Sequence, residues 1–281
     1  MSGTLYLVGT PIGNLGDISQ RCREILEQAD FIAAEDTRVT LKLLNHLGLH
    51  KPLVSYYEHN RASSGQKILQ RLEDGESCAL VSDAGMPAIS DPGEDLVRQC
   101  AQLDIPVTTV PGPTALISAL TLSGLPTGRF TFEGFLSVNN KSRRAHLDAL
   151  AAEERTMLFY EAPHKLVATL KDMAALFGGD RRIALCRELT KLHEEVFRTT
   201  LDDALARYAE EAPRGEFVLV VAGCEKAEAE AAPDLEQALA QIDALCGDGL
   251  SRRDAIRQVS QATGIPKNQL YRAAQNEEET E

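Results

Sequence analysis

Short apolar runs alternate along the first half of the chain with longer segments in which apolar residues recur at helical spacing. The short runs predict buried strands, at Thr4–Val8, Phe31–Ala34, Leu53–Tyr57, Cys78–Ser82 and Val107–Val110. The spacing of Leu41, Leu44 and Leu47, ended by Gly48, is typical of the helices between them. Strands that alternate with helices favour a largely parallel sheet that helices cover on both faces.

A second set of apolar runs follows Leu122–Thr127, whose glycine and proline interrupt the pattern. These runs predict strands near Arg129–Phe132, Thr156–Tyr160, Ile183–Cys186, Val196–Thr200 and Phe217–Val221. Their last connections are shorter, which favours a mixed sheet. We therefore expect one α/β domain at residues 1–122 and another at 123–224. Residues 225–236, rich in alanine and glutamate, predict a linker, and residues 237–276 a small helical extension.

Composition narrows the class of protein. The 281 residues are 43% hydrophobic, enough for real cores, which excludes disorder for most of the chain. The net charge of −13 means that contact with a nucleic acid needs local basic patches. The six cysteines form no CxxC pair, which favours reduced thiols over a zinc site, and we expect no metal. With no signal peptide and no run long enough to span a membrane, we expect a cytoplasmic protein.

Three turn-rich loops follow three of the predicted strands. The longest, Val81–Gly93 (VSDAGMPAISDPG), contains too much glycine and proline for regular structure. Gly9–Asp17 and Pro111–Thr114 are turns of the same kind. Each alone is compatible with an ordinary strand-to-helix turn, and none is a dinucleotide or P-loop fingerprint. Because the carboxyl ends of parallel strands share one edge of a sheet, the three together predict a ligand site there.

Polar clusters also stand at predicted strand ends. Glu35–Arg38 combines two carboxylates with a guanidinium, although a helix cap with a local ion pair explains it equally. Tyr160–Lys165 and Arg187–Lys191 are similar clusters in the second half. The lone histidine of the first of these, His164, is more often structural than catalytic at such a position.

The segment Ser251–Ala274 has the outline of a helix-turn-helix, with Gly264-Ile265-Pro266 as the turn. Its basic residues outnumber its one acid, Asp254, in a chain that is otherwise acidic. A solvated helical cap is the simpler interpretation, but the charge contrast favours a polyanionic partner. A second basic run lies at Lys141–Arg144.

Taken together, these motifs resemble those of the tetrapyrrole-methylase-fold methyltransferases, which use S-adenosylmethionine. Within that family the chain is most similar to bacterial enzymes that methylate the ribose 2′-oxygen of a cytidine in small-subunit (16S) ribosomal RNA. The resemblance rests on eight segments: Gly9–Ser19, Ala33–Arg38, Val81–Gly93, Val110–Leu120, Phe132–Leu136, Phe159–Leu166, Arg187–Glu195 and Gly215–Val221.

The resemblance implies two α/β domains of the tetrapyrrole methylase type, with S-adenosylmethionine in the cleft between them, plus the C-terminal helical appendage. It also implies a homodimer. Carried over position by position, the cofactor is expected to contact Pro11, Ile12, Asp83, Ala84, Gly85, Met86, Thr114, Ala115, Ala162 and Phe217.

A ribose hydroxyl is a weak acid, so its attack on a methyl group needs a proton acceptor. The candidates are the strand-end carboxylates Glu35, Asp36 and Glu161. Contacts with ribosomal RNA or the small ribosomal subunit are expected from Arg38, Lys141, Arg143, Arg144, Arg187, Lys191, Arg252, Arg253, Arg257 and Lys267. Two alternatives stay open: a methyltransferase for a corrin or porphyrin precursor, and a DNA-binding regulator that senses a small ligand.

Overall fold

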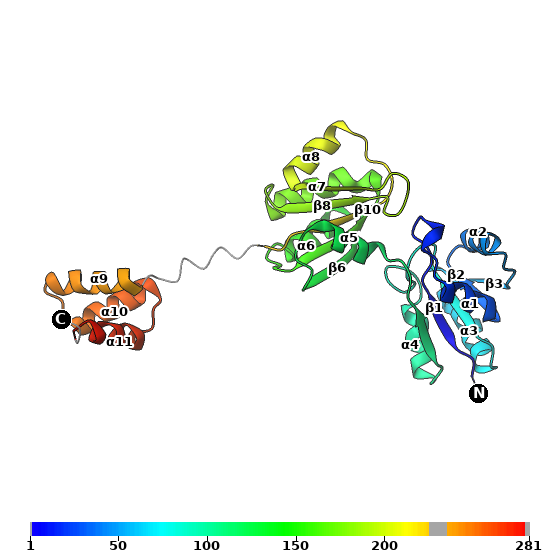
Figure 1. Ribbon diagram of the computed structural model, residues 1–281, viewed down its shortest axis with the longest axis horizontal. Helices are drawn as coiled ribbons and strands as arrows, with labels where there is room; N and C mark the ends of the chain where they lie inside the picture. The colour runs from blue at the N-terminus through cyan, green and yellow to red at the C-terminus, as the bar shows by residue number, and fades with distance from the viewer. Residues whose placement is uncertain (1, 225–234, 279–281) are drawn as a thin grey trace. The chain divides into compact units, whose positions relative to one another are not determined.

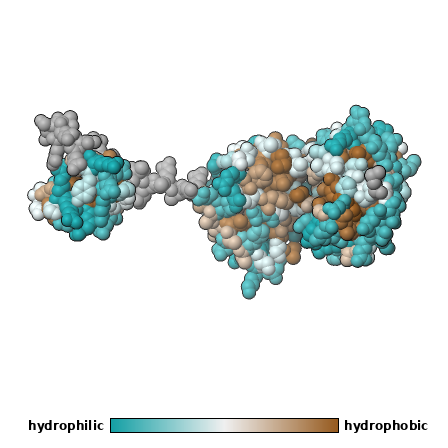
Figure 2. Space-filling view, turned by 90° about the horizontal axis from the view of Figure 1, so that it is seen from below, coloured by the Kyte–Doolittle hydropathy of each residue, from teal (hydrophilic) through white to brown (hydrophobic). Residues whose placement is uncertain are grey.

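The computed structural model describes residues 2–224 and 235–278, which form two compact units, one on each side of the Cys224–Leu235 segment (Figure 1). The first is an α/β unit with two five-stranded sheets. The second is helical and presents a mostly hydrophilic surface, whereas apolar side chains gather on the viewed face of the α/β unit (Figure 2). No described helix is both long and apolar enough to cross a membrane.

The first sheet is fully parallel, as predicted, with the strand order β3-β2-β4-β1-β5. Its strands are β1 (Leu5–Val8), β2 (Phe31–Ala34), β3 (Leu53–Ser55), β4 (Cys78–Val81) and β5 (Val107–Val110). Four helices and one 3₁₀ turn connect them: η1 (Leu15–Asp17), α1 (Gln20–Gln28), α2 (Thr37–Leu47), α3 (Arg61–Glu73) and α4 (Glu94–Gln102).

Both faces of this sheet are buried, which explains why its strands have continuous apolar runs. Along β2, Phe31 belongs to the core shared with α3 and α4, whereas Ile32 belongs to the core shared with α1 and α2. Successive residues of a strand point to opposite faces, so a strand covered on both sides needs apolar residues throughout.

The second sheet is mixed, also as predicted, with the order β6-β7-β10-β8-β9. Only the β6–β7 pair is parallel. Its strands are β6 (Phe130–Phe135), β7 (Thr156–Glu161), β8 (Arg182–Arg187), β9 (Glu195–Thr200) and β10 (Phe217–Val221). Three helices pack on one face: α6 (Asn140–Ala149), α7 (Pro163–Phe177) and α8 (Leu201–Glu210).

Helix α5 (Ala115–Ser123) covers the other face of this second sheet. Ala119 and Leu120 pack there against Ala184 and Val218. The helix thus packs with the second half, although the expected domain limit at residue 122 placed it in the first. The change from one sheet to the other comes at the turn before α5, so that turn stands between the two halves.

The helical unit contains α9 (Leu235–Gly247), α10 (Arg252–Thr263) and α11 (Lys267–Glu278). They enclose a small core that includes Ile242, Ile256 and Leu270. The Ser251 hydroxyl caps α10, and Gly264, with φ of 75°, ends it. The short turn between α10 and α11 agrees with the helix-turn-helix outline in the sequence.

Candidate active site

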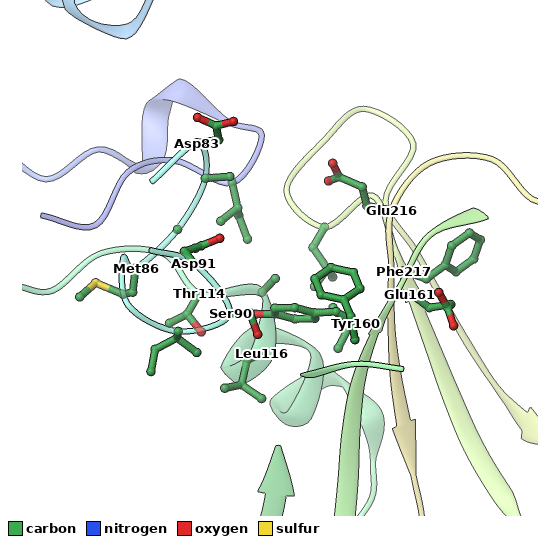
Figure 3. Close-up of a pocket in the computed structure, with 18 of the residues that line it drawn as sticks. Asp83, Met86, Ser90, Asp91, Thr114, Leu116, Tyr160, Glu161, Glu216 and Phe217 are labelled. Atoms are coloured by element: carbon green, nitrogen blue, oxygen red, sulfur yellow. The ribbon is translucent and has the colours of Figure 1, made fainter. Parts of the chain in front are cut away.

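A cavity of about 650 Å³ lies between the two sheets of the α/β unit (Figure 3). From the first half it is lined by the ends of β2 and β4 and by the loops after β1, β4 and β5. From the second half, β6, β7, β8 and β10 contribute. Its size is typical of pockets for small molecules and cofactors.

The three turn-rich loops meet at this cavity, as the sequence predicted. The Thr10 and Gly85 backbones exchange two hydrogen bonds, of 2.9 and 3.1 Å, which join the loop after β1 to the loop after β4. Gly85 has a φ of +82°, and a Cβ there would lie 3.3 Å from Ile12 and 3.4 Å from the Pro113 carbonyl. Glycine is therefore required by conformation, and the three loops form one continuous wall.

Backbone strain is concentrated in two loops that line the cavity. Ala88 and Ser90, in the loop after β4, have φ of 67° and 61°. Glu188 and Thr190, in the loop after β8, have φ of 50° and 67°. Non-glycine residues adopt this region at a cost of order 1–3 kcal/mol, and such residues cluster at functional sites. The positions of these four therefore make the cavity a candidate functional site on grounds other than sequence motifs.

Three carboxylates form one acidic wall: Glu35 at the end of β2, and Asp83 and Asp91 in the loop after β4. Asp83 accepts a hydrogen bond of 3.0 Å from the Asp36 amide. Burial, followed by the negative charge of Asp83, raises the pKa of Glu35. Burial and then the charge of Glu35 raise the pKa of Asp91 to about 6, although a hydrogen bond with Ser82 opposes this. The wall therefore favours a cationic ligand or a proton.

Residues 4–205 match the model of the tetrapyrrole (corrin/porphyrin) methylases. The chain belongs to this family. It is 49% identical over 269 residues to the ribosomal RNA small subunit methyltransferase I of Synechocystis sp., with 96% of each chain covered. It is 45% identical to the protein of that name from Pseudomonas aeruginosa, over 97% of each chain.

A crystal structure of uroporphyrin-III C-methyl transferase from Thermus thermophilus, complexed with S-adenyl homocysteine, shares the fold. Its TM-score is 0.56 at 18% identity, and the match covers 78% of this chain and 97% of that one. The predicted fold class is thereby confirmed. Membership of this methylase family also confirms that the cofactor is S-adenosylmethionine, as expected.

The cavity residues fit that cofactor chemically. Apolar side chains such as Ile12, Leu116 and Leu189 provide surface for an adenosine, and the acidic wall offsets the positive sulfonium and ammonium groups. Nine of the ten residues predicted to bind the cofactor line the cavity, all except Pro11. The Phe217 ring itself packs away from it, against Tyr208 at 5.7 Å, so Phe217 contributes its backbone.

The three predicted catalytic carboxylates lie in different surroundings. Glu35 lines the cavity. Asp36 does not: it caps α2 and binds the Arg38 guanidinium at 2.6 Å, which lowers its pKa to about 2. Glu161 is buried, and its carboxylate points away from the ring of Tyr160 (Figure 3). It accepts hydrogen bonds from the Ala162 amide at 2.8 Å and the Thr169 hydroxyl at 2.5 Å. Glu161 also contributes to the cavity lining, but these two hydrogen bonds hold its carboxylate, so Glu35 is better placed than Glu161 to meet a substrate.

Several cavity residues stand in the predicted strands or motifs but were not among the predicted site residues. They are Ile89, Ser90, Asp91, Leu116, Ile117, Phe135, Tyr160, Pro163, Cys186, Leu189, Glu216 and Val218. Tyr160 and Val218 could have been found because successive side chains of a strand point to opposite faces of the sheet. Their neighbours Glu161 and Phe217 point to the other face. For Asp91 the signal was its place in a loop dense in glycine and proline.

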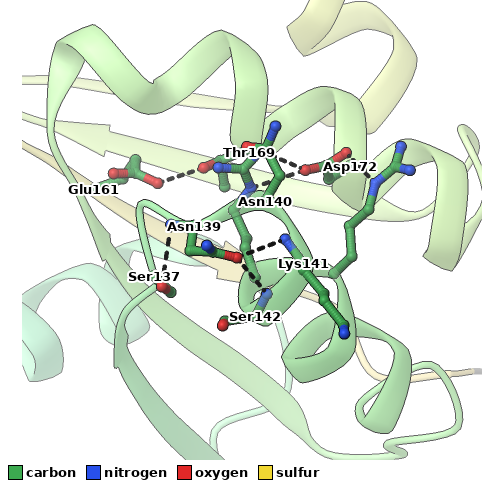
Figure 4. Close-up of polar contacts among 10 residues, drawn as sticks. Ser137, Asn139, Asn140, Lys141, Ser142, Glu161, Thr169 and Asp172 are labelled. Atoms are coloured by element: carbon green, nitrogen blue, oxygen red, sulfur yellow. Dashed lines mark hydrogen bonds and ion pairs between the residues drawn. The ribbon is translucent and has the colours of Figure 1, made fainter.

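The predicted RNA-binding cations of the α/β unit are mostly paired with carboxylates, among them the Asp172 carboxylate labelled in Figure 4. Arg143, which was predicted to contact RNA, is only 7% exposed, and its guanidinium binds Asp172 at 2.6 Å. Arg144 also binds Asp172 but is 61% exposed. Lys141 is exposed in the first turn of α6, which Asn139 caps. Arg143 therefore stabilises the fold, whereas Lys141 and Arg144 face solvent.

The other predicted cations divide in the same way. Arg187 binds Glu195 at 3.1 Å, and Lys191 binds Glu188 and Glu216 at 2.8 Å each. Arg38 is 87% exposed despite its pairing with Asp36. In the helical unit, Arg252 donates to the Ala274 carbonyl at 3.0 Å, and the other three predicted cations are exposed: Arg253, Arg257 and Lys267.

Proposed function

We propose that this methyltransferase methylates the ribose 2′-oxygen of a cytidine in small-subunit ribosomal RNA. The observation that carries the proposal is the identity of 45–49% to two proteins named for that RNA, over 96–97% of each chain. Those matches extend through the helical unit, whose exposed cations suit an RNA phosphate backbone. A cytoplasmic location and the pairing of two copies remain parts of this proposal.

The first alternative, a methyltransferase for a corrin or porphyrin precursor, has weaker support. The uroporphyrin-III C-methyl transferase is only 18% identical to this chain. Such precursors carry several carboxylates, whereas the described residues that line the cavity include acids but no lysine or arginine. Like charges disfavour that substrate. The DNA-binding regulator has no observation in its favour beyond the helix-turn-helix outline.

The cavity can supply what methyl transfer to a hydroxyl requires. When bound, S-adenosylmethionine supplies an electrophilic methyl group on its sulfonium. The protein holds the acceptor oxygen in line with that group and excludes water, and such alignment supplies much of the rate acceleration. Glu35 accepts the hydroxyl proton in this proposal, because the carboxylate of Glu161, the other predicted carboxylate that lines the cavity, is held by hydrogen bonds from Ala162 and Thr169. Its raised pKa brings it closer to neutral pH, which suits a general base.

A transfer assay tests the proposal. The purified chain is incubated with S-adenosylmethionine labelled in its methyl group and with small ribosomal subunits, free ribosomal RNA, a uroporphyrin-type tetrapyrrole or duplex DNA. We expect label in the RNA alone. Label in the tetrapyrrole, or none in either RNA sample, would contradict the proposal.

The matched control combines Asp83→Ala with Gly85→Val. A valine at a φ of +82° is strained, and its methyl groups enter the space beside Ile12. This variant is expected to lose cofactor binding while its circular dichroism stays that of the wild type.

A further inference from the structure

Strand β6 contains an irregularity that changes which face its last residue occupies. Phe132 pairs with Leu158, but Gly134 pairs with Phe159 and Phe135 with Tyr160, so one extra residue stands in β6. Gly134 has a φ of 66°. In a regular strand Phe132 and Phe135 would point to opposite faces. The bulge brings both to the face of Tyr160, and bulges next to active sites re-aim side chains in this way.

The re-aimed ring lies at the cavity and is left open to solvent. Phe135 lines the cavity at 5.4 Å from the Tyr160 ring, tilted by 59°. It is 56% exposed, the most of any aromatic side chain in the described residues. Tyr160 is itself braced by Phe132 at 4.9 Å, and its hydroxyl is hydrogen-bonded to the Leu116 backbone. The Phe135 ring therefore has a rigid support on one side and free space on the other.

Two more exposed apolar side chains border the same cavity: Ile89 at 48% and Ile117 at 43%. Together with Phe135 they form an apolar rim. A rim of this kind suits a flat ring with two apolar faces. Phe135 is not among the ten residues expected to contact the cofactor, and its exposed ring stands at the rim of the cavity, so we assign the ring to the other reactant.

We propose that Phe135 is the platform on which the base of the acceptor nucleotide stacks while its ribose lies in the cavity. This inference rests on the proposed function. Proteins that act on one nucleotide of an RNA separate it from its neighbours and stack its base on an aromatic side chain. Stacking of one base is worth about 1–3 kcal/mol, which corresponds to a roughly 5- to 150-fold change in affinity.

Steady-state methylation of small ribosomal subunits by four variants tests the platform. Phe135→Ala and Phe135→Leu are expected to lower kcat/KM for the RNA by roughly 5- to 150-fold. Phe135→Tyr keeps the ring and is expected to retain wild-type kcat/KM. Phe130→Leu is the matched control, because Phe130 is 37% exposed on the same strand but does not line the cavity. The dissociation constant for S-adenosylmethionine is expected to stay unchanged in all four.

A fluorescent variant separates the two reactants. The chain contains no tryptophan, so Phe135→Trp introduces a single tryptophan at the rim, whose emission can be excited selectively. S-adenosylhomocysteine alone is expected to leave its emission unchanged. Quenching by that compound would assign the ring to the cofactor and overturn the inference, as would wild-type kcat/KM in Phe135→Leu. Absence of RNA methylation by the wild-type chain would instead overturn the proposed function.

Discussion

Replacing Asp91 by asparagine is expected to stabilise the fold while it weakens activity. Asp91 is partly buried in the acidic wall, where burial and the charge of Glu35 raise its pKa from 3.8 to about 6. A carboxylic acid whose pKa is raised on folding is destabilised in its charged form. The resulting loss in the free energy of unfolding is absent below pH 3.8, where Asp91 is protonated in both states. It grows as the pH rises to about 6 and is complete above that value.

The size of the effect follows from the shift. A change of about two pKa units corresponds to about 3 kcal/mol. Because Asp91 is only partly buried, solvent screening reduces this to about 1–2 kcal/mol. Asparagine has nearly the same shape and no charge, so it removes the penalty. We therefore expect the free energy of unfolding at pH 7.5 to rise by about 1–2 kcal/mol, and by about a third of that at pH 4.5.

Urea denaturation of the wild type and Asp91→Asn at these two pH values measures the difference. The control is Asp148→Asn, which removes an exposed carboxylate from α6 and is expected to change stability by less than about 0.5 kcal/mol. A gain of equal size at both pH values, or no gain at pH 7.5, would refute the reasoning about the acidic wall.

Three further predictions follow from the contacts described. Asp172→Asn leaves Arg143 without its buried counter-ion and should lower the free energy of unfolding by about 3–5 kcal/mol in urea denaturation, whereas a loss below 1 kcal/mol would place that pair at the surface. Glu35→Gln should lower kcat without raising the dissociation constant for the cofactor. Glu161→Gln should chiefly lower the melting temperature, because it disturbs two buried hydrogen bonds. The reverse pattern in kinetics and calorimetry would exchange their roles. Ending the chain after Gly223 should weaken RNA binding more than cofactor binding, and the remaining RNA affinity should depend less on salt concentration. An unchanged salt slope in an RNA-binding titration would make the helical unit merely structural.

Much of the fold could be predicted because hydrophobic patterning determines it directly. The bounds of β2, β5 and β10 agree with the pattern to the residue. Strands β2 and β10 are buried along their whole length, so the sequence changes character where each strand ends. The shape of the β6 bulge could not be predicted, because an extra residue in a strand leaves the composition of the run unchanged.

The parts of the candidate site that loops form could be predicted from the sequence. The parts that depend on the direction of a side chain could not. Gly85 and its neighbours were found because glycine and proline signal a special backbone. The hydrogen bonds that hold the Glu161 carboxylate could not be predicted, because a strand-end position does not reveal which face a side chain occupies. Arg143 was misjudged because its partner, Asp172, lies in another helix, and one cation in a basic run does not differ from the next in sequence. In both cases the deciding contact is tertiary.

The central claim is that the acceptor atom is a cytidine 2′-oxygen of small-subunit RNA. Alkaline hydrolysis of RNA that the chain has methylated tests it most directly, because cleavage at the 3′ side of a nucleotide requires a free 2′-hydroxyl. The account predicts one new position that resists cleavage, at a cytidine that carries the transferred label. Label at a nucleotide that is still cleaved by alkali would place the methyl group on a base and contradict the account.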